Sequence, residues 1–573
     1  MTTDQSTLTP MQRFWKLLKP DQKEIRNVYI YSIFNGLINL SLPLGIQAII
    51  NLIQGGQVST SWIILVFFVV LGVGMAGLLQ IFQLHITESI QQKIFARAAF
   101  EFAYRIPKIK MERLYKHYAP ELMNRFFDII SVQKGLSKIL IDFSAAALQV
   151  IFGLILLSFY HPFFVIFSFI LVILVYVIFR YTSKKGLETS LKESKHKYAV
   201  AHWLEELART ATAFKLAGDS DLPMTKINAN VGQYVDARQS HFKVLVQQFS
   251  FMVLFKVIVA AGLLLIGGIL VMEQRMNIGQ FVAAEIIILL VISSVEKLVL
   301  SLETIYDVLT SLEKVGQVTD MELESNDGIN LCDETTGKGL TVNLDHVSFA
   351  YPGYHKQTIK DVTIEIKQGK SYMITGANGS GKSTLLNLIS GLFDVQEGTV
   401  SYNGLAKDNL QVNSLRIEIG SCLSEEQLFE GTVLENISVG RENVSFENVR
   451  WAVENLGLAD FVKSLSKGYD THLDPLGKKL PRSIIRKMLL ARSIASKPSL
   501  LLLESAFDSL DDEDMKKIID FLTDKSNNWT IVAVSNNMHY AKSCDQVVVL
   551  ERGAIGKTGT YEEMKEIINF INL

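Results

Sequence analysis

The feature that most constrains this chain is a long stretch, Asn27 to Thr87, that contains no Asp, Glu, Lys or Arg. A helix needs about 20 apolar residues to cross the hydrocarbon core of a bilayer. The stretch is therefore long enough for two membrane spans, and the sequence Gln-Gly-Gly-Gln at 54–57 is typical of a turn between them. The sequence thus predicts two transmembrane helices before residue 88.

Two further apolar regions repeat this pattern. The uncharged stretch from Phe143 to Phe179 is interrupted by His161-Pro162, and the apolar region from Val244 to Leu302 is interrupted by Glu273-Gln274-Arg275. Each interruption predicts a short turn between two spans. The recurrence of such segments also argues against a cleaved signal peptide. The sequence therefore predicts six transmembrane helices within residues 25–310, after a short cytoplasmic segment, 1–24.

The distribution of Lys and Arg predicts which side each connection faces. The connection from Glu88 to Ile141 holds ten basic residues and the one from Arg180 to Lys243 is similarly rich, whereas the short loops hold only Arg275. We therefore expect the N-terminus, both long connections and everything after the sixth span to be cytoplasmic. Apolar residues recur with helical spacing in the first long connection, as at Ile129 and Val132, so helices should extend beyond the bilayer.

Two ionisable residues lie inside predicted spans. Lys256 lies 16 residues before Met272, roughly 24 Å from that end of the helix at 1.5 Å per residue. Snorkelling to the cytoplasmic interface is the simplest account of such a lysine. Glu285 lies in the outer third of the sixth span, where a role facing a transport pathway and a satisfied contact between helices are both open. The two residues are too far apart along the membrane normal to pair with each other.

The composition becomes mixed after residue 310. Residues 311–339 are interpreted as a linker, and residues 340–573 alternate β-rich with helical runs, as in an α/β domain. Continuous apolar runs at Leu500–Leu503 and Ile531–Val534 predict buried parallel strands. The whole chain has 56 basic and 58 acidic residues, which excludes a nucleic-acid binder that relies on bulk positive charge. Its three widely spaced cysteines exclude a disulfide scaffold.

The strongest chemical signal is a full G-x-x-x-x-G-K-[ST] motif between a predicted strand and a predicted helix. Glycines let backbone N–H groups approach phosphate closely, and the start of the helix adds a partial positive charge. In such a loop Lys382 supplies a charge for the β- and γ-phosphates, and Ser383 can ligate Mg²⁺. The predicted phosphate-binding residues are Gly376, Ala377, Asn378, Gly379, Ser380, Gly381, Lys382, Ser383 and Thr384.

Six spans followed by such a domain resemble a half-size ABC exporter over essentially the whole chain. The stretch Val347–Pro352 resembles the family segment whose aromatic residue stacks on adenine, which assigns that role to Tyr351. The resemblance implies a helical membrane domain of the type I exporter kind, a P-loop NTPase domain, and ATP with Mg²⁺ as cofactors. Glu121–Asp128 and Ser311–Gly316 are similar to hemolysin-type, or type I secretion, exporters.

Departures from the family pattern concentrate on the hydrolytic machinery. Counting along the family motifs places the Q-loop glutamine on Ser424, the catalytic glutamate on Ser505 and the switch histidine on Asn536; His539 is not an equivalent of the last. The Mg²⁺-binding aspartate is replaced by Glu504, which keeps a carboxylate. The signature L-S-G-G-Q falls on Leu480, Pro481, Arg482, Ser483 and Ile484.

Each replacement has a chemical meaning. The Ser505 hydroxyl is no base near neutral pH, and Asn536 cannot carry a proton. Without Ser-Gly-Gly, the backbone near Pro481 cannot approach an opposing γ-phosphate closely. No catalytic residue of the family is therefore intact, and we expect the chain to bind ATP and to hydrolyse it poorly or not at all. Arg482 is either a phosphate-directed arginine facing an opposing chain or a solvated residue at a helix start.

The resemblance also implies partners. In this family a site forms between one chain's phosphate loop and the other chain's signature, so the chain should act as a dimer in the bacterial inner membrane. We expect a heterodimer with a second half-transporter, although a homodimer is possible, and a periplasmic adaptor if the host has two membranes. Export is the first interpretation, and a non-hydrolysing regulatory or scaffolding subunit is the alternative. Nothing predicts the cargo.

Overall fold

The computed structural model describes residues 8–54, 60–333 and 339–571. The described chain forms two compact units, one comprising the residues up to Pro107 together with Tyr118–Met321, and one comprising Lys108–His117 together with Glu322 onward. The units are not two continuous stretches of sequence, because a short segment of the first long connection, Lys108–His117, packs in the second unit. Residues 311–319, which fall in the predicted linker, are helical.

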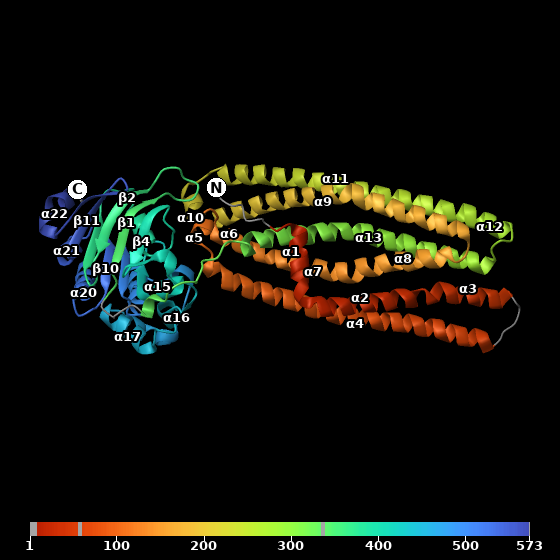
Figure 1. Ribbon diagram of the computed structural model, residues 1–573, viewed down its shortest axis with the longest axis horizontal. Helices are drawn as coiled ribbons and strands as arrows, with labels where there is room; N and C mark the ends of the chain where they lie inside the picture. Colours follow the sequence, from red (N-terminus) through yellow and green to blue (C-terminus); the bar gives the residue numbers. More distant parts are fainter. Residues whose placement is uncertain (1–7, 55–59, 334–338, 572–573) are drawn as a thin grey trace. The chain divides into compact units, whose positions relative to one another are not determined.

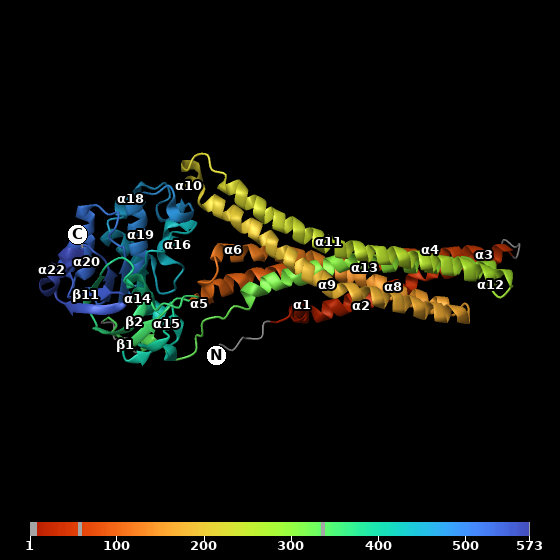
Figure 2. The ribbon, with the colours of Figure 1, turned by 90° about the horizontal axis from the view of Figure 1, so that it is seen from above.

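The first unit consists of long, apolar helices that run side by side (Figures 1 and 2). Among the described residues, six helical stretches are long and apolar enough to cross a membrane, which confirms the predicted number of spans. Several of them greatly exceed the ~20 residues that a span needs. The stretches are built from α1 (Pro10–Leu18), α2 (Gln22–Asn39) and α3 (Ser41–Gln54); α4 (Thr60–Arg105); α6 (Ala119–Asn124), α7 (Asp128–Lys138) and α8 (Ser144–Ser158); α9 (Pro162–Arg209); α11 (Leu222–Gly262) and α12 (Gly268–Met272); and α13 (Ile278–Thr319).

Short loops separate these helices where the sequence predicted turns. Helix α8 ends at Ser158 and α9 begins at Pro162, next to the predicted interruption, and α12 ends at Met272 before α13 begins at Ile278. The central residues of the predicted turn at 54–57 lie outside the described residues. A π-helical turn, Ile139–Phe143, joins α7 to α8, and a second, Leu263–Gly267, joins α11 to α12. The first ends at Phe143, where the third predicted span begins, and the second lies inside the fifth predicted span.

An ion pair that sequence reasoning missed lies between two of these helices. Lys256 on α11 donates to the Glu296 carboxylate on α13 at 2.6 Å, so Lys256 has a specific partner and not only an interfacial position. The two residues are 40 positions apart in sequence, and only the packing of α11 on α13 brings them together. Glu285 is half-buried and has no hydrogen-bond or ion-pair partner among the described residues.

The second unit is an α/β domain built on a six-stranded sheet, visible in the blue and green part of Figure 1. Its strand order is β12-β11-β3-β10-β9-β6, with parallel pairing from β11 through β6, as the continuous apolar runs predicted. The strands are β3 (Ser371–Thr375), β6 (Ile419–Cys422), β9 (Leu500–Glu504), β10 (Thr530–Val534), β11 (Gln546–Glu551) and β12 (Ala554–Gly559). Helices pack on it: α14 (Lys382–Ile389), α15 (Val412–Glu418), α16 (Val433–Ser438), α17 (Phe446–Asn455), α18 (Ala459–Ser464), α19 (Arg482–Ile494), α20 (Asp512–Thr523), α21 (Met538–Ser543) and α22 (Tyr561–Ile571).

A smaller antiparallel sheet of order β2-β1-β4-β5 completes the domain, together with a two-stranded β7-β8 ribbon. Its strands are β1 (Val342–Phe349), β2 (Ile359–Ile366), β4 (Glu397–Tyr402) and β5 (Leu405–Ala406); the ribbon pairs β7 (Gly431–Thr432) with β8 (His472–Leu473). The segment Lys108–His117, with the short helix α5 (Met111–Leu114), joins this unit through a bridge from Ile109 to Leu323.

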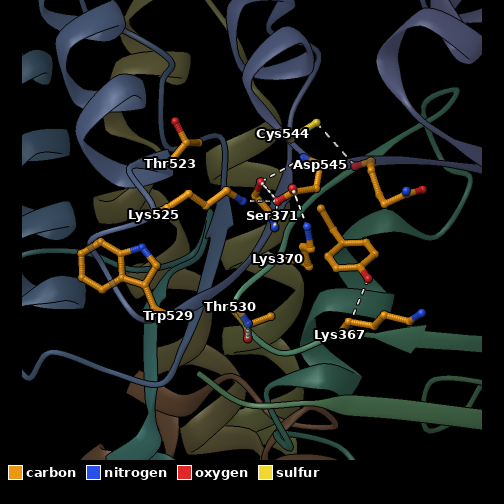
Figure 3. A network of polar contacts seen from close by, with 12 residues as sticks. Lys367, Lys370, Ser371, Thr523, Lys525, Trp529, Thr530, Cys544 and Asp545 are labelled. Atoms are coloured by element: carbon orange, nitrogen blue, oxygen red, sulfur yellow. Dashed lines mark hydrogen bonds and ion pairs between the residues drawn. The ribbon is translucent and has the colours of Figure 1, made fainter. Parts of the chain in front are cut away.

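A polar network fixes the start of the central strand β3 (Figure 3). The Asp545 carboxylate accepts hydrogen bonds from the Ser371 backbone N–H and hydroxyl, each at 2.9 Å. The ammonium groups of Lys370 and Lys525 donate to the same carboxylate at 3.1 and 2.6 Å. Burial alone would raise the pKa of Asp545, but these hydrogen bonds hold it well below its usual range. The network positions the strand that leads into the phosphate loop.

Candidate nucleotide site

The phosphate loop adopts a conformation that its glycines alone allow. Gly376 (φ 143°) and Gly381 (φ 104°) both have left-handed backbone angles. A Cβ atom on Gly376 would lie 2.2 Å from the Leu550 carbonyl oxygen, and one on Gly381 would lie 3.0 Å from the Thr358 carbonyl oxygen. The loop is therefore pressed against β11 and the segment before β2, and α14 starts directly after it.

Two side chains of the loop have groups suited to an anion. The Lys382 ammonium donates to the carbonyl oxygens of Gly376 and Ala377 at 2.8 and 2.9 Å. Partial burial lowers the pKa of Lys382, and the nearby Glu504 carboxylate counteracts this effect. The Ser380 hydroxyl is buried and has no hydrogen-bond partner in the described chain. A phosphate in the loop would supply an acceptor for both groups.

Glu504, at the end of β9, is the polar centre of the site. Its side chain is buried, and one carboxylate oxygen accepts a short hydrogen bond from the Ser383 hydroxyl. The other oxygen accepts from the Ser424 hydroxyl at 2.8 Å and from the Ser424 backbone N–H at 3.2 Å. The structure therefore brings together the predicted metal ligands Ser383 and Glu504 and the residue at the Q-loop position. A hydroxyl and a carboxylate are oxygen ligands of the kind that Mg²⁺ prefers, so these residues fit the ion.

The positions expected to carry hydrolysis also line this cavity. Ser505 and Asn536 both lie on the wall of a cavity of about 430 Å³ together with the phosphate loop. The Asn536 amide oxygen accepts a hydrogen bond from the Thr375 hydroxyl at 2.9 Å. His539 is directed elsewhere, since its Nε2 atom contacts the Asp520 carboxylate on α20 at 2.9 Å. No histidine is among the residues that line the described cavity.

Tyr351, the predicted adenine-stacking residue, has an unexpected neighbour. Its ring stacks on that of Tyr115, with 4.7 Å between centroids and 18° between planes. Phe349 and Phe393 contact the Tyr351 ring edge-on, and its hydroxyl lies 3.0 Å from that of Thr384. Burial is also the main cause of a raised pKa of Tyr115. Sequence reasoning missed Tyr115, because it belongs to a connection of the membrane half and no local motif marks it.

The predicted signature segment lies apart from this cavity in the same unit. Leu480 ends a tight turn through a backbone hydrogen bond to Gly477, Pro481 precedes α19, and Arg482 is its first residue. The side chains of Ser483 and Ile484 are half-buried, whereas that of Arg482 is exposed. None of the five residues lines the phosphate-loop cavity. The arrangement is compatible with contact to an opposing chain, and the role of the segment stays a prediction.

The cavity wall contains three residues that sequence reasoning did not single out: Thr358, Asp508 and Ser535. Thr358, before β2, supplies the carbonyl that contacts Gly381, and it lines the cavity. Asp508, four residues after Glu504, adds an exposed carboxylate to the wall. The position of Asp508 directly after the β9 strand was a usable signal, because polar residues at the carboxyl ends of parallel strands gather at one edge of a sheet.

Comparisons with known proteins agree with this geometry. Residues 26–295 match the family of the ABC transporter transmembrane region, and residues 359–508 match the ABC transporter family of the nucleotide-binding domain. In fold, the chain is similar to a bacterial Atm1-family ABC exporter solved with ATP bound, with a TM-score of 0.83 at 17% identity over 96% of this chain and 97% of that one.

Relatives of known sequence are similar over part of the chain. The β-(1→2)glucan export ATP-binding/permease protein NdvA of Brucella suis is 28% identical over 303 residues, 53% of this chain and 50% of NdvA. A Staphylococcus aureus ATP-binding/permease protein named for multidrug export is 32% identical over 250 residues, 44% of this chain and 43% of the relative. The chain thus matches about half the length of these curated relatives.

Proposed function

Because this chain joins an ABC transporter transmembrane region to an ABC transporter nucleotide-binding domain, as half-size ABC exporters do, we propose that it is the ATP-binding subunit of an export transporter. The observation that carries the proposal is the complete phosphate loop, from Gly376 to Ser383, beside the buried Glu504 carboxylate. In this proposal, ATP binding is coupled to outward movement of a cargo through the six helical spans.

Each residue of the loop has a defined task in nucleotide binding. The backbone of the loop surrounds the phosphates, and the Lys382 ammonium exchanges its contacts with the Gly376 and Ala377 carbonyls for phosphate oxygens. Ser383 and Glu504 would hold Mg²⁺, which neutralises phosphate charge when it is bound. The Tyr351 ring would support the adenine. Most of the loop and Glu504 line one cavity, and the Tyr351 hydroxyl lies 3.0 Å from that of Thr384 on the same wall.

Hydrolysis by this chain is proposed to be weak or dependent on a partner. A water that attacks the γ-phosphate needs a group that accepts its proton or orients it. Ser505 offers a neutral hydroxyl at that position and Asn536 offers an amide, so neither supplies a base. Glu504 is assigned to Mg²⁺ in this proposal and already accepts hydrogen bonds from Ser383 and Ser424, so it is not assigned the role of the base. Asp508 is the one further carboxylate on the described cavity wall.

We also propose that the working unit is a dimer with a second half-transporter. A homodimer would have two sites that lack both the base and a glycine-rich signature. A partner with an intact set would supply one base opposite Leu480–Ile484, and one signature opposite this chain's phosphate loop. The stretches Glu121–Asp128 and Ser311–Gly316, which resemble hemolysin-type exporters, support an inner-membrane location with a cytoplasmic nucleotide site and a periplasmic adaptor.

A polar cavity within the helical unit supports transport over the alternative of a regulatory or scaffolding subunit. The cavity has a volume of about 550 Å³ and lies between four helices, α2, α4, α8 and α13, with the start of α3 and the π-turn before α8 completing its wall. Polar groups inside spans are costly and therefore mark functional surfaces. The Gln83 amide oxygen is buried without a hydrogen-bond partner in the described chain. Side-chain amides and a hydroxyl contribute to the wall from all four helices: Asn35, Asn39, Gln80, Gln83, Gln149 and Ser293.

The direct test is equilibrium ATP binding by the purified full chain. Lys382→Ala removes the phosphate-directed charge and should weaken binding at least tenfold, about 1.4 kcal/mol. Mg²⁺-dependent hydrolysis by the chain alone should stay near background. Robust turnover that Lys382→Ala abolishes would overturn the weak-hydrolysis proposal, and loss of that turnover in Asp508→Asn would then identify the base.

Co-purification separates the two interpretations of the subunit. A transport subunit should purify with a half-transporter that has an intact signature and catalytic glutamate, and the pair should move cargo in proteoliposomes. A scaffold should bind ATP without any cargo movement by the reconstituted pair.

A further inference from the structure

A second cavity, unrelated to the nucleotide site, lies entirely within the helical unit. It has a volume of about 900 Å³ and is lined by the start of α1, by α6 and the turn after it, and by α9, α11 and α13. We call it the basic cavity, after five of its lining residues: Arg125, Lys195, His196, His202 and Lys314. Arg125 and Lys314 fall in the two stretches that resemble hemolysin-type exporters, but neither that resemblance nor the proposed function gives any of the five side chains a role.

The basic cavity lies far from the end of the bundle where the short loops are. Tyr198, on its wall, follows the first residue of α9 by 36 positions, and Lys314 follows the first residue of α13 by 36 positions. At 1.5 Å per residue each lies roughly 54 Å along its helix. A bilayer with its headgroups is only about 40–45 Å thick. The cavity is therefore beyond the membrane, on the aqueous extension of the helices.

Lys314 is a buried cation without an anion. Its side chain is 9% exposed, and its ammonium lies 5.2 Å from the centre of the Tyr198 ring. No residue of the described chain gives this ammonium an ion pair or a hydrogen bond. Two nearby carboxylates have other partners: Glu313 pairs with Arg13, and Asp128 accepts from the Tyr198 hydroxyl. A lysine is almost never this buried unless it is paired.

Arg125, on the same cavity wall, is a second largely buried cation with little pairing to an anion. Its side chain is 11% exposed and its closest carboxylate contact, with Glu121, is long at 3.9 Å. Its Nε atom is buried without a hydrogen-bond partner, and so is the Nδ1 atom of His202, which lies 3.5 Å from the same Glu121 carboxylate. One carboxylate thus serves an arginine and a histidine, while Lys314 has none. The wall thus has two cationic donors, Arg125 Nε and the Lys314 ammonium, that have no hydrogen-bond acceptor among the described residues.

From this surplus of buried donors we infer that the basic cavity binds a soluble ligand that carries a phosphoryl group. A guanidinium and an ammonium together match the charge and the several acceptor oxygens of a phosphoryl group better than those of a single carboxylate. The volume falls in the range of small-molecule sites and exceeds what inorganic phosphate needs. Leu8, Pro10 and Leu191 give part of the wall an apolar character that suits an organic group.

Pyrophosphate is the probe, and the full chain in detergent, in phosphate-free buffer, is the sample. The background variant Lys382→Ala removes the phosphate-directed charge of the nucleotide site, so binding can be assigned to the basic cavity. Calorimetric titration should detect pyrophosphate binding in this background. Lys314→Met should weaken it at least tenfold, and Arg125→Lys, which keeps the charge but removes the planar fork, should weaken it by a smaller factor. Lys192→Met, at an exposed lysine of α9 that does not line the cavity, is the matched control.

Thermal unfolding provides a second measurement that does not depend on a binding signal. If Lys314 is an unpaired buried charge, Lys314→Met should raise the Tm in phosphate-free buffer, because the desolvated charge is removed. Pyrophosphate should raise the Tm of the Lys382→Ala chain and leave that of the double variant unchanged. A lower Tm for Lys314→Met without ligand, or pyrophosphate binding that Lys314→Met does not affect, would overturn the inference.

The source of the phosphoryl group is decided in nanodiscs. Pyrophosphate binding should be equal in discs of phosphatidylcholine and in discs that contain phosphatidylglycerol, because the cavity lies beyond the headgroups. Competition by phosphatidylglycerol would show that the ligand is a lipid headgroup and would overturn the inference of a soluble one. Failure of ATP to bind the wild-type nucleotide site would reject the proposed function and leave this site untouched.

Discussion

The phosphate loop and the predicted signature segment belong to the same compact unit, yet the first keeps the motif of an ABC exporter and the second does not. The loop from Gly376 to Ser383 keeps every residue of its motif, whereas Leu480–Ile484 keeps only the first. The loop is packed against β11, so its glycines serve the fold as well as the ligand. The signature segment starts a helix on the surface, where only an opposing chain would need its glycines. The residues that shape the phosphate loop and give it its charge are thus retained, whereas four of the five residues at the predicted signature positions differ from the motif.

The largest expected effect on ATP affinity comes from a substitution in the retained phosphate loop. Gly376→Ala would place a Cβ atom 2.2 Å from the Leu550 carbonyl oxygen, so the loop must move off β11. We expect ATP affinity to fall about a hundredfold, about 2.7 kcal/mol, in an equilibrium binding measurement. Gly379→Ala is the matched control: its Cβ atom would meet nothing within 4 Å, so it should lose far less. Equal losses in the two variants would show that the close contact with β11 is not what shapes the loop.

The next effect concerns the stability of β3, the strand that leads into the phosphate loop. Asp545→Asn removes the charged acceptor that holds Ser371 at the start of β3. We expect the free energy of unfolding to fall by about 2 kcal/mol. Most of this loss should come from the bonds to Ser371, because Lys370 and Lys525 are exposed and their ion pairs contribute little. The folded pKa of Asp545 is depressed, so its contribution is complete above the unfolded value, about pH 4, and is lost as the pH falls further. Hydrogen exchange of the β3 amides should show a constant difference between wild type and variant from pH 5 to 8. A difference that grows on acidification would contradict this assignment.

A smaller effect is expected where the adenine would stack. The Tyr115 ring covers one face of Tyr351, and aromatic pairs of this kind contribute about 0.5–1.5 kcal/mol. If adenine takes that face, Tyr115→Leu should tighten ATP binding by up to about tenfold, because the nucleotide no longer displaces a ring. Tyr354→Leu, at an exposed tyrosine nearby in sequence, should have no effect. Weaker ATP binding in Tyr115→Leu would mean that Tyr115 supports the base and does not compete with it.

Arg482 tests whether the replaced signature has kept any phosphate-directed group. If its exposed guanidinium faces the opposing nucleotide, Arg482→Ala should reduce ATP-dependent crosslinking between the two nucleotide-binding domains several-fold. This chain's own ATP affinity should stay unchanged, because Arg482 does not line the cavity. Equal crosslinking in variant and wild type would make Arg482 a surface residue.

The smallest expected effect is none at all. Ser505→Glu restores a carboxylate beside Glu504, but an opposing copy of this chain still presents Pro481-Arg482-Ser483 in place of the signature glycines. Groups that act as one catalytic unit are strongly non-additive, so hydrolysis by the homodimer should stay near background. Turnover at the rate typical of the family from this single change, measured as phosphate release, would show that the signature segment is not limiting.

The sequence predicted those parts of the fold whose signals are local. Four of the six spans follow from uncharged runs and two from an apolar region with few charges, and β3, the phosphate loop and α14 follow from one motif in its proper context. It could not predict contacts that depend on packing between distant segments. Lys256 and Glu296 are on separate helices, and four of the six spans lie between Tyr115 and Tyr351 in sequence. Arg125 and Lys314 share a cavity without sharing a motif. For the nucleotide site, the missing residues Thr358 and Asp508 are near motifs that had been identified.

The π-helical turn at Ile139–Phe143 gives one helical stretch two registers. A π-turn holds one residue more than an α-turn, which shifts the side chains on its two sides by about 100° relative to an uninterrupted helix. The buried face of α7 and that of α8 are therefore offset around the helix axis from the positions they would have in one continuous α-helix. Ile141 and Asp142, inside the turn, line the cavity of about 550 Å³ within the helical unit. If the same residues formed an uninterrupted α-helix, the buried face of α8 would turn by that angle relative to α7, so the extra residue in the π-turn is what keeps both faces packed.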